Sequence, residues 1–289
     1  SEKRRYNACQ LDVNCQQTLL DQRDAVIRMF YVSQGRTFQC TGTLLNNARQ
    51  DLTPYVLTAA HCVKDQATAS TLQTSWFYYS QYCDSAQLYA GHAERFSAAR
   101  WLATSMATDM TLLLLDEAPP PGALFAGWDA GALPPGGAVA GLHHPHGDLM
   151  MLASGVLEDR TACSVDASSR ALDCAPQTQS DGGFYRVIWS LGGIEGGSSG
   201  SALFFRGRVA GTLTGGDQWC AAKDGRVVYG RLDQAIASFA AWLGADKAMN
   251  SDMHMPVYRF LVLRSGGEFY TLSATERDHV IASFPNDLV

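Results

Sequence analysis

Residues 196–201 read Gly-Gly-Ser-Ser-Gly-Ser, a run in which glycines flank paired serines. Glycine on both sides permits a tight turn that presents a serine hydroxyl and leaves backbone N–H groups open. A serine hydroxyl is a poor nucleophile unless a base lies within hydrogen-bonding distance and a third group orients that base. Taken alone, the run is more typical of a plain loop. The remaining chain therefore has to supply a histidine and a carboxylate in suitable contexts.

A histidine and an aspartate each stand beside an apolar segment. His61 follows the run Tyr55–Ala60, and Asp109 precedes the run Thr111–Leu115. An aspartate at the end of a strand is either exposed or buried with partners, because an unpaired buried carboxylate costs several kcal/mol. A histidine is a natural partner. Together with Ser199, these residues occur in the order His, Asp, Ser, which is the order found in chymotrypsin.

Short segments rich in β-branched and aromatic residues recur from residue 25 onward, separated by Gly, Asn, Asp or Pro. This pattern predicts strands and therefore an all-β barrel or sandwich. The predicted strands span residues 25–32, 37–45, 55–58, 75–79, 111–115, 138–142, 185–189, 202–205, 209–213 and 227–232. Residues 117–137 and 164–183 lack strand character and are predicted to be long surface loops.

Helical spacing of apolar residues covers 232–243, and Gly244 is placed to end that helix. We predict that this helix closes a first domain over residues 1–247. Residues 253–289 are too few to hold a core alone, and they are predicted to form a small α+β appendage with strands over 257–263 and 269–272 and a helix over 274–282. Residues 256–260, 266–271 and 274–278 resemble a short repeat of bacterial extracellular proteins. Binding of a surface or a carbohydrate and simple structural packing are both open roles for this appendage.

The charge and hydropathy of the chain exclude several classes of partner. The net charge of −6 argues against nucleic acid, which requires a basic face. No apolar run approaches the roughly 18 to 20 residues that span a bilayer, and no signal-peptide core follows the first residues. We therefore expect a soluble mature chain that binds no nucleic acid and does not span a membrane.

Eight cysteines occur, and no pair has the two-residue spacing of a zinc knuckle or redox site. Disulfides are the natural interpretation. Because disulfides persist in oxidising compartments, the chain is expected to be secreted, with the periplasm as an alternative. Eight reduced cysteines in a cytosolic enzyme are the competing interpretation.

Three motifs together resemble those of the trypsin-like serine proteases. They are Thr-Ala-Ala-His-Cys at residues 58–62, Asp109 before an apolar strand, and Gly-Ser-Ser-Gly-Ser at residues 197–201. More narrowly, residues 40–47, 126–129 and 143–145 look like the bacterial lysyl endopeptidase branch. The match covers about residues 7–243. It implies a chymotrypsin-like double β-barrel with a C-terminal helix, and a serine endopeptidase whose partner is a peptide or protein substrate.

The resemblance assigns roles to individual residues. Ser199 attacks the peptide carbonyl, His61 accepts its proton, and Asp109 orients the histidine. The N–H groups of Gly197 and Ser199 form the oxyanion hole. Ser198 and Ser201 are rival nucleophiles on composition alone, and the register of the motif favours Ser199.

No cofactor and no metal are predicted. His143, His144 and His146 with Asp148 could otherwise form a metal cluster. The His-His-Pro portion, however, matches the protease family at a place that is not a metal site there.

The resemblance also implies a disulfide pattern. It joins Cys9 to Cys220, Cys15 to Cys83 and Cys40 to Cys62. Cys163 and Cys174 are left over, and they close a local loop.

The specificity pocket departs from the lysyl endopeptidases. Those enzymes carry an aspartate two residues before Tyr-Gly-Arg, where this chain has Val227, and a histidine where it has Thr214. A lysine side chain against Val227 would be a buried unpaired charge. The expected pocket consists of Ile194, Glu195, Thr214, Gly215, Gly216 and Val227. It favours an uncharged aliphatic or medium apolar side chain, with Glu195 as a complication.

Three alternatives stay open from the sequence. One is a catalytically silent protease fold used for binding or adhesion. Another is a lysyl or glutamyl endopeptidase with a differently built pocket. The third is an esterase or transferase that uses the same triad.

Overall fold

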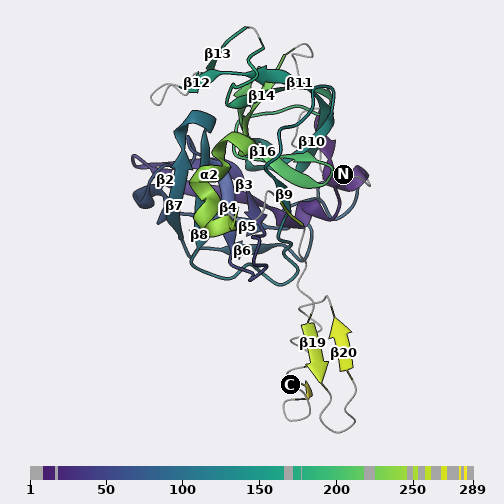
Figure 1. Ribbon diagram of the computed structural model, residues 1–289. Helices are drawn as coiled ribbons and strands as arrows, with labels where there is room; N and C mark the ends of the chain where they lie inside the picture. The colour runs from purple at the N-terminus through teal and green to yellow at the C-terminus, as the bar shows by residue number, and fades with distance from the viewer. Residues whose placement is uncertain are drawn as a thin grey trace.

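A computed structural model shows a chain built mostly of β-strands in two large sheets (Figure 1). The structure describes residues 9–16, 19–165, 172–176, 178–217, 225–245, 250–252, 258–261, 268–271, 280 and 283–284. The predicted all-β fold is confirmed.

The first sheet, here the N-terminal sheet, contains seven antiparallel strands in the order β6-β5-β2-β3-β4-β8-β7. Its strands are β2 (Val26–Ser33), β3 (Arg36–Leu45), β4 (Tyr55–Ala59), β5 (Gln73–Trp76), β6 (Ala93–Arg95), β7 (Ala99–Ser105) and β8 (Met110–Leu115). Every residue of β4 is buried, because its continuous apolar run lies at the centre of the sheet. The end of this strand leads directly into His61.

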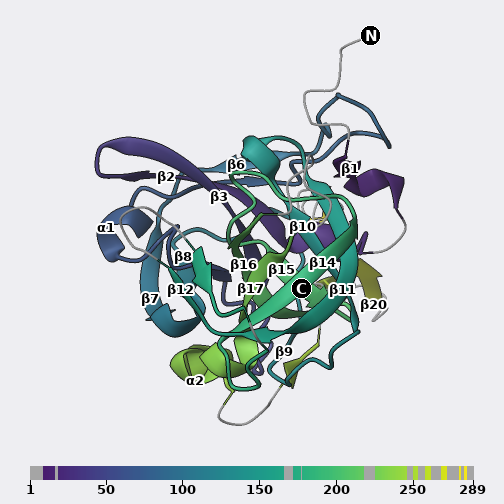
Figure 2. The same ribbon diagram turned by 90° about the horizontal axis from the view of Figure 1, so that it is seen from above.

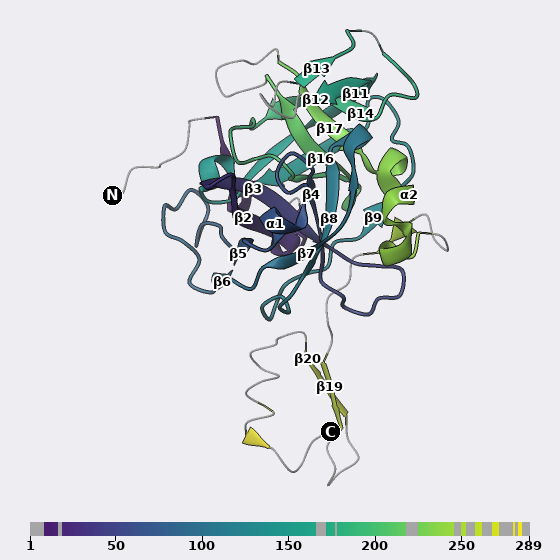
Figure 3. The same cartoon turned by 90° about the vertical axis from the view of Figure 1, so that its left-hand side faces the viewer.

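The second sheet contains a closed barrel, here the C-terminal barrel. Its six strands are β10 (Ala138–His143), β11 (Met151–Thr161), β14 (Phe184–Leu191), β15 (Ala202–Phe205), β16 (Arg208–Gly216) and β17 (Val227–Arg231). The barrel closes because β15 pairs with both β10 and β16. Short strands β1 (Leu11–Asp12), β9 (Trp128–Asp129) and β18 (Asn250–Ser251) extend this sheet. Figure 3 shows the two sheets one above the other.

The helix α2 (Leu232–Leu243) has the predicted bounds. Gly244 ends it in the left-handed conformation, with φ of 73°. Leu232, Ala235, Phe239 and Leu243 form its buried face. The helix contacts β7 of one sheet and β16 of the other, so it covers the junction between them. Figure 2 shows α2 beside β7. Burial of a side chain such as Phe239 contributes roughly 1.5–3 kcal/mol.

Single-turn helices occur between the strands. They are α1 (Gln66–Ala69), η1 (Val13–Cys15), η2 (Gln22–Ala25), η3 (Met106–Thr108) and η4 (Pro145–Gly147). Of these, η3 and η4 matter most for function, because η3 leads into Asp109 and η4 packs behind residues 196–201.

The longest strand, β11, was not predicted. Its second half carries the charged run Glu158-Asp159-Arg160, which hides the strand pattern. In the structure Asp159 is paired with Arg186 on the neighbouring strand β14. The predicted loop 164–183 was also partly wrong, because β12 (Cys163–Val165) and β13 (Leu172–Cys174) form a small hairpin there.

Three of the four expected disulfides are present, joining Cys15 to Cys83, Cys40 to Cys62 and Cys163 to Cys174. Cys9 is disulfide-bonded as well. Its predicted partner Cys220 lies outside the described residues. Within the described part of the chain, no helix has the length and apolar character needed to cross a membrane.

The strands β19 (Tyr258–Leu261) and β20 (Glu268–Thr271) pair antiparallel in the segment where two strands were predicted. The helix predicted over 274–282 lies almost entirely outside the described residues. The division of the chain at residues 247 and 253 stays a prediction.

Candidate active site

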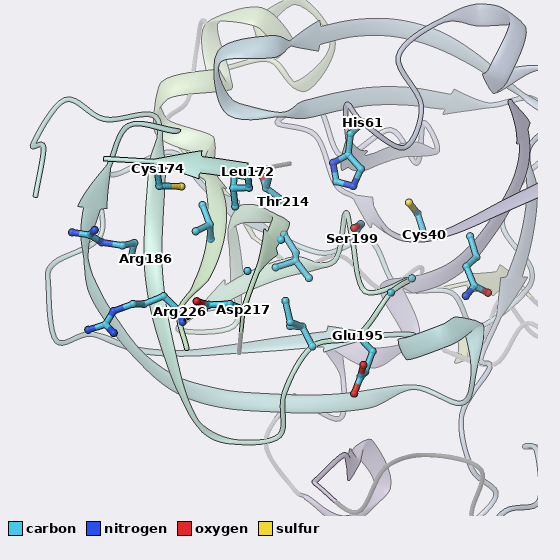
Figure 4. A pocket seen from close by; sticks show the side chains of 18 of the residues that line it. Cys40, His61, Leu172, Cys174, Arg186, Glu195, Ser199, Thr214, Asp217 and Arg226 are labelled. Atoms are coloured by element: carbon cyan, nitrogen blue, oxygen red, sulfur yellow. Dashed lines mark hydrogen bonds between the residues drawn. The ribbon is translucent and has the colours of Figure 1, made fainter. Parts of the chain in front are cut away.

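A cavity of about 570 Å³ brings together residues from both sheets (Figure 4). His61 and Cys40 come from the N-terminal sheet, and Ser199 and Thr214 come from the C-terminal barrel. In Figure 4 the ring of His61 lies above Ser199, and both residues border the cavity. The structure therefore brings two members of the expected triad to one cavity.

Asp109 contacts His61 through both of its carboxylate oxygens. Its Oδ2 atom lies 2.7 Å from Nδ1 of His61, and its Oδ1 accepts the backbone N–H of His61 at 2.8 Å. The Asp109 backbone carbonyl accepts the N–H of Ala60 at 3.0 Å. Because Nδ1 faces the carboxylate, Nε2 is the ring nitrogen left for the cavity. The side chain of Asp109 is only 3% exposed, so this buried carboxylate depends on these partners.

Asp109 has a left-handed backbone, with φ of 52°, at the junction between η3 and β8. Aspartate tolerates this conformation better than bulky residues do. The turn lets one residue direct both carboxylate oxygens at His61. The Cys40–Cys62 disulfide adjoins His61 and ties its segment to β3.

Residues 196–201 form a tight turn in which the three serines have different environments. Ser198 and Ser201 are fully buried, whereas Ser199 is partly exposed and lines the cavity. The hydroxyl of Ser198 is bonded to His143 Nδ1 at 2.8 Å. Of these three serines, only Ser199 therefore presents its hydroxyl to the cavity.

The two candidate oxyanion donors flank Ser198. Gly197 has a φ of 92°, which favours glycine. Among the described residues, neither the Gly197 N–H nor the Ser199 N–H donates to a protein acceptor. The carbonyl groups of both residues are held by Thr41 on β3: its N–H donates to Ser199 O at 2.8 Å, and its hydroxyl donates to Gly197 O at 2.9 Å.

Five of the six expected pocket residues line the cavity, namely Ile194, Glu195, Thr214, Gly215 and Gly216. Val227 does not. Its side chain is fully buried in the core of the C-terminal barrel, while its neighbours Arg226 and Val228 line the cavity. Adjacent residues of a strand point to opposite faces, so the expectation that Val227 forms the pocket floor was wrong.

Sequence reasoning also missed Leu172 and Asp217, which line the same cavity. Leu172 lies on β13, inside a segment predicted to be a loop. Asp217 follows β16, and its Oδ1 accepts the N–H of Arg226 at 2.6 Å. The alternation of β17 could have revealed Val228, but no sequence pattern indicated that β13 returns to the cavity.

Two arginines at the cavity are neutralised by partners. Arg186 makes a two-pronged contact with Asp159, and this hydrogen bonding lowers the pKa of the aspartate. Arg226 pairs in the same way with Glu158. Arg186 also donates to the carbonyls of Ala175 and Pro176, so it fixes the chain beside the Cys163–Cys174 hairpin.

The histidines at 143–146 do not form a converging set of metal ligands with Asp148, all four residues being described. His144 Nδ1 is bonded to the Asp148 carbonyl at 3.0 Å. Burial lowers the pKa of both His143 and His144 to about 3. Both rings are therefore neutral at physiological pH.

Residues 5–230 match the family model described as lysyl endopeptidase, C-terminal domain. The chain belongs to the lysyl endopeptidase family. A lysyl endopeptidase of Pseudomonas aeruginosa is 34% identical over 207 residues, which cover 68% of this chain and 42% of that protein. This member thus matches less than half the length of that curated relative.

Solved structures with the same fold are more distant. The active form of the Rv3671c protease of M. tuberculosis aligns with a TM-score of 0.53 at 14% identity, covering 84% of this chain and 94% of that one. The scabies mite inactivated protease paralogue S-I1 aligns with a TM-score of 0.55 at 12% identity, covering 80% and 98%. These likenesses show the chymotrypsin-like fold of the lysyl endopeptidase family member.

Proposed function

We propose that this family member is a secreted serine endopeptidase that cleaves peptide bonds through Ser199, His61 and Asp109. The observation that carries the proposal is the contact between buried Asp109 and His61, 2.7 Å apart, where His61 lines the same cavity as Ser199. The disulfides support an oxidising location outside the cytosol.

The chemistry follows from this arrangement. Ser199 Oγ attacks the peptide carbonyl while His61 Nε2 takes its proton, and His61 then returns the proton to the leaving amine. Asp109 stabilises the imidazolium formed between these steps. The open N–H groups of Gly197 and Ser199 receive the negative charge on the carbonyl oxygen, and loss of one such donor typically lowers kcat by about 100- to 1,000-fold. Water then hydrolyses the acyl-enzyme by the same route.

We further propose that the residue before the cleaved bond is uncharged and aliphatic or of medium size. Ile194 and Val228 supply apolar lining, and Gly215 and Gly216 leave space beside them. The two carboxylates in the lining have partners of their own: Asp217 accepts the Arg226 N–H, and Glu195 lies 3.5 Å from His146 Nε2. A lysine side chain would therefore compete with existing contacts.

The triad is tested by Ser199→Ala, with Ser190→Ala, at an exposed serine, as the matched control. We expect Ser199→Ala to lower kcat on a mixed peptide library by about 10⁶-fold, as for other triad serines. A phosphonylating reagent should label wild type and Ser190→Ala, and it should fail to label Ser199→Ala. Undiminished hydrolysis by Ser199→Ala would rule the proposal out.

The specificity is tested separately by mapping the cleavage sites in a denatured protein. Cleavage after alanine, valine or leucine is expected. Preferential cleavage after lysine would instead support a lysyl endopeptidase with a differently built pocket, and cleavage after glutamate a glutamyl one. A wild-type chain inactive on all peptides would favour the silent binding fold, and faster turnover of esters than of amides would favour an esterase.

A further inference from the structure

Each of the two peptide groups that carry the candidate oxyanion donors is held by a hydrogen bond to its carbonyl oxygen. A peptide unit is planar, so the direction of its carbonyl fixes the opposite direction of its N–H. The Gly196 carbonyl accepts the backbone N–H of His146 at 2.5 Å, which orients the Gly197 N–H. The Ser198 carbonyl accepts the Ser201 N–H at 3.1 Å, which orients the Ser199 N–H.

Ser198 supplies the carbonyl of the second of these peptide units, and its side chain is buried and does not line the cavity. Its hydroxyl accepts the Glu195 N–H at 3.1 Å, while its own N–H donates to the Glu195 carbonyl at 3.1 Å. This reciprocal pair closes a small ring at the start of the turn. The same hydroxyl is bonded to His143 Nδ1 at 2.8 Å.

The histidine at position 143 is unfavourable for the stability of the fold. It ends β10, is 1% exposed, and its Nε2 atom has no hydrogen-bond partner among the described residues. A buried polar atom without a hydrogen-bond partner destabilises the folded state. An apolar side chain of similar size would avoid that cost, so stability alone does not explain a histidine there. Its bond to Ser198, directly behind the nucleophile, does.

We propose that Ser198 and His143 are positioning residues that preorganise the oxyanion hole before substrate arrives. The inference rests on the proposed endopeptidase function. His143 holds the Ser198 hydroxyl through its hydrogen bond. Ser198 in turn maintains the hydrogen-bonded ring with Glu195, and this ring fixes the N–H groups of Gly197 and Ser199 toward the cavity. Preorganised donors act on the charge that develops during the reaction, so their loss lowers kcat and leaves KM unchanged.

The deciding variants are Ser198→Ala, His143→Leu and the conservative His143→Asn, whose amide can reach Ser198 from near the Nδ1 position. Misplacement of reacting groups by about 1 Å costs on the order of 100-fold. We therefore expect kcat to fall about 10- to 100-fold in Ser198→Ala and His143→Leu, with unchanged KM and partial recovery in His143→Asn. Thr212→Val is the control, because Thr212 is also fully buried but its hydroxyl has no partner among the described residues.

Two measurements distinguish positioning from general destabilisation. Affinity for a peptide boronic acid, which forms a tetrahedral adduct at the serine, should fall in parallel with kcat, while affinity for an uncleavable peptide stays constant. The double variant Ser198→Ala/His143→Leu should have a kcat no lower than that of the slower single variant. Both substitutions break the same hydrogen bond between Ser198 and His143, so their effects do not add.

Wild-type kcat and inhibitor affinity in folded Ser198→Ala would overturn the inference, as would fully additive losses in the double variant. If His143→Leu fails to fold, Ser198→Ala and His143→Asn still decide the matter. Failure of the endopeptidase proposal would look different, because Ser199→Ala would then retain full activity.

Discussion

Two histidines in this molecule occupy opposite kinds of environment. His61 borders the cavity and faces the Asp109 carboxylate, whereas His143 is buried and faces the Ser198 hydroxyl. A carboxylate stabilises an imidazolium, so His61 is equipped to gain and lose a proton. Burial lowers the pKa of His143 to about 3, so its ring stays neutral and can only hold a position. The partner and the solvent access of the ring, rather than the residue type, separate proton transfer from positioning.

Of the effects expected at the two histidines, the largest comes from removal of the Asp109 charge beside His61. In Asp109→Asn the amide holds the wrong tautomer of His61, and kcat should fall by about 10⁴-fold. Steady-state peptide hydrolysis measures this change. Asp116→Asn is the control, because Asp116 pairs with Arg100 at the surface. Equal activity in Asp109→Asn and wild type would remove the contrast between the two histidines.

A smaller effect, on the free energy of unfolding, is expected from the two buried histidines His143 and His144. The pKa of His143 and His144 falls from 6.5 to about 3 on folding. Between these values the unfolded chain binds more protons than the folded chain, so stability is kept above about pH 6.5 and lost as the pH falls. At pH 5 each histidine should lower the free energy of unfolding by about 2 kcal/mol relative to pH 7.

Urea unfolding of wild type and His143→Asn at pH 7 and pH 5 measures this contribution. The difference between the two pH values should shrink by about 2 kcal/mol in the variant. An unchanged difference would show that His143 is protonated equally in the folded and unfolded states.

The smallest effect is expected at His146, whose side chain is 66% exposed and lies 3.5 Å from Glu195. A contact made by a side chain as exposed as that of His146 contributes about 0–1 kcal/mol. His146 has a φ of 52°, which asparagine tolerates and valine does not. His146→Asn should therefore change the free energy of unfolding by less than about 0.5 kcal/mol, whereas His146→Val should cost roughly 1–3 kcal/mol. Equal thermal denaturation of the two variants would show that this backbone conformation is unimportant.

The sequence predicted those parts of the site that depend on short motifs. His61, Asp109 and Ser199 each adjoin a distinctive local pattern, and α2 carries both a clear period and a terminal glycine. The strands of continuous apolar composition, such as β4 and β8, were predicted for the same reason.

The features that were missed depend on contacts between distant residues. Ser198 is fixed by His143, which lies 55 residues earlier in the chain. Val227 was expected in the pocket, but its side chain lies in the core of the C-terminal barrel and the neighbouring Val228 lines the cavity.

Thr41 gives the molecule a mechanical property. It belongs to the N-terminal sheet, yet it donates two hydrogen bonds to the turn at residues 196–201, which precedes β15 of the C-terminal barrel. A slight separation of the halves would pull on Gly197 and Ser199 before any strand is lost. Moderate denaturant should therefore inactivate the protein while its circular dichroism is still native.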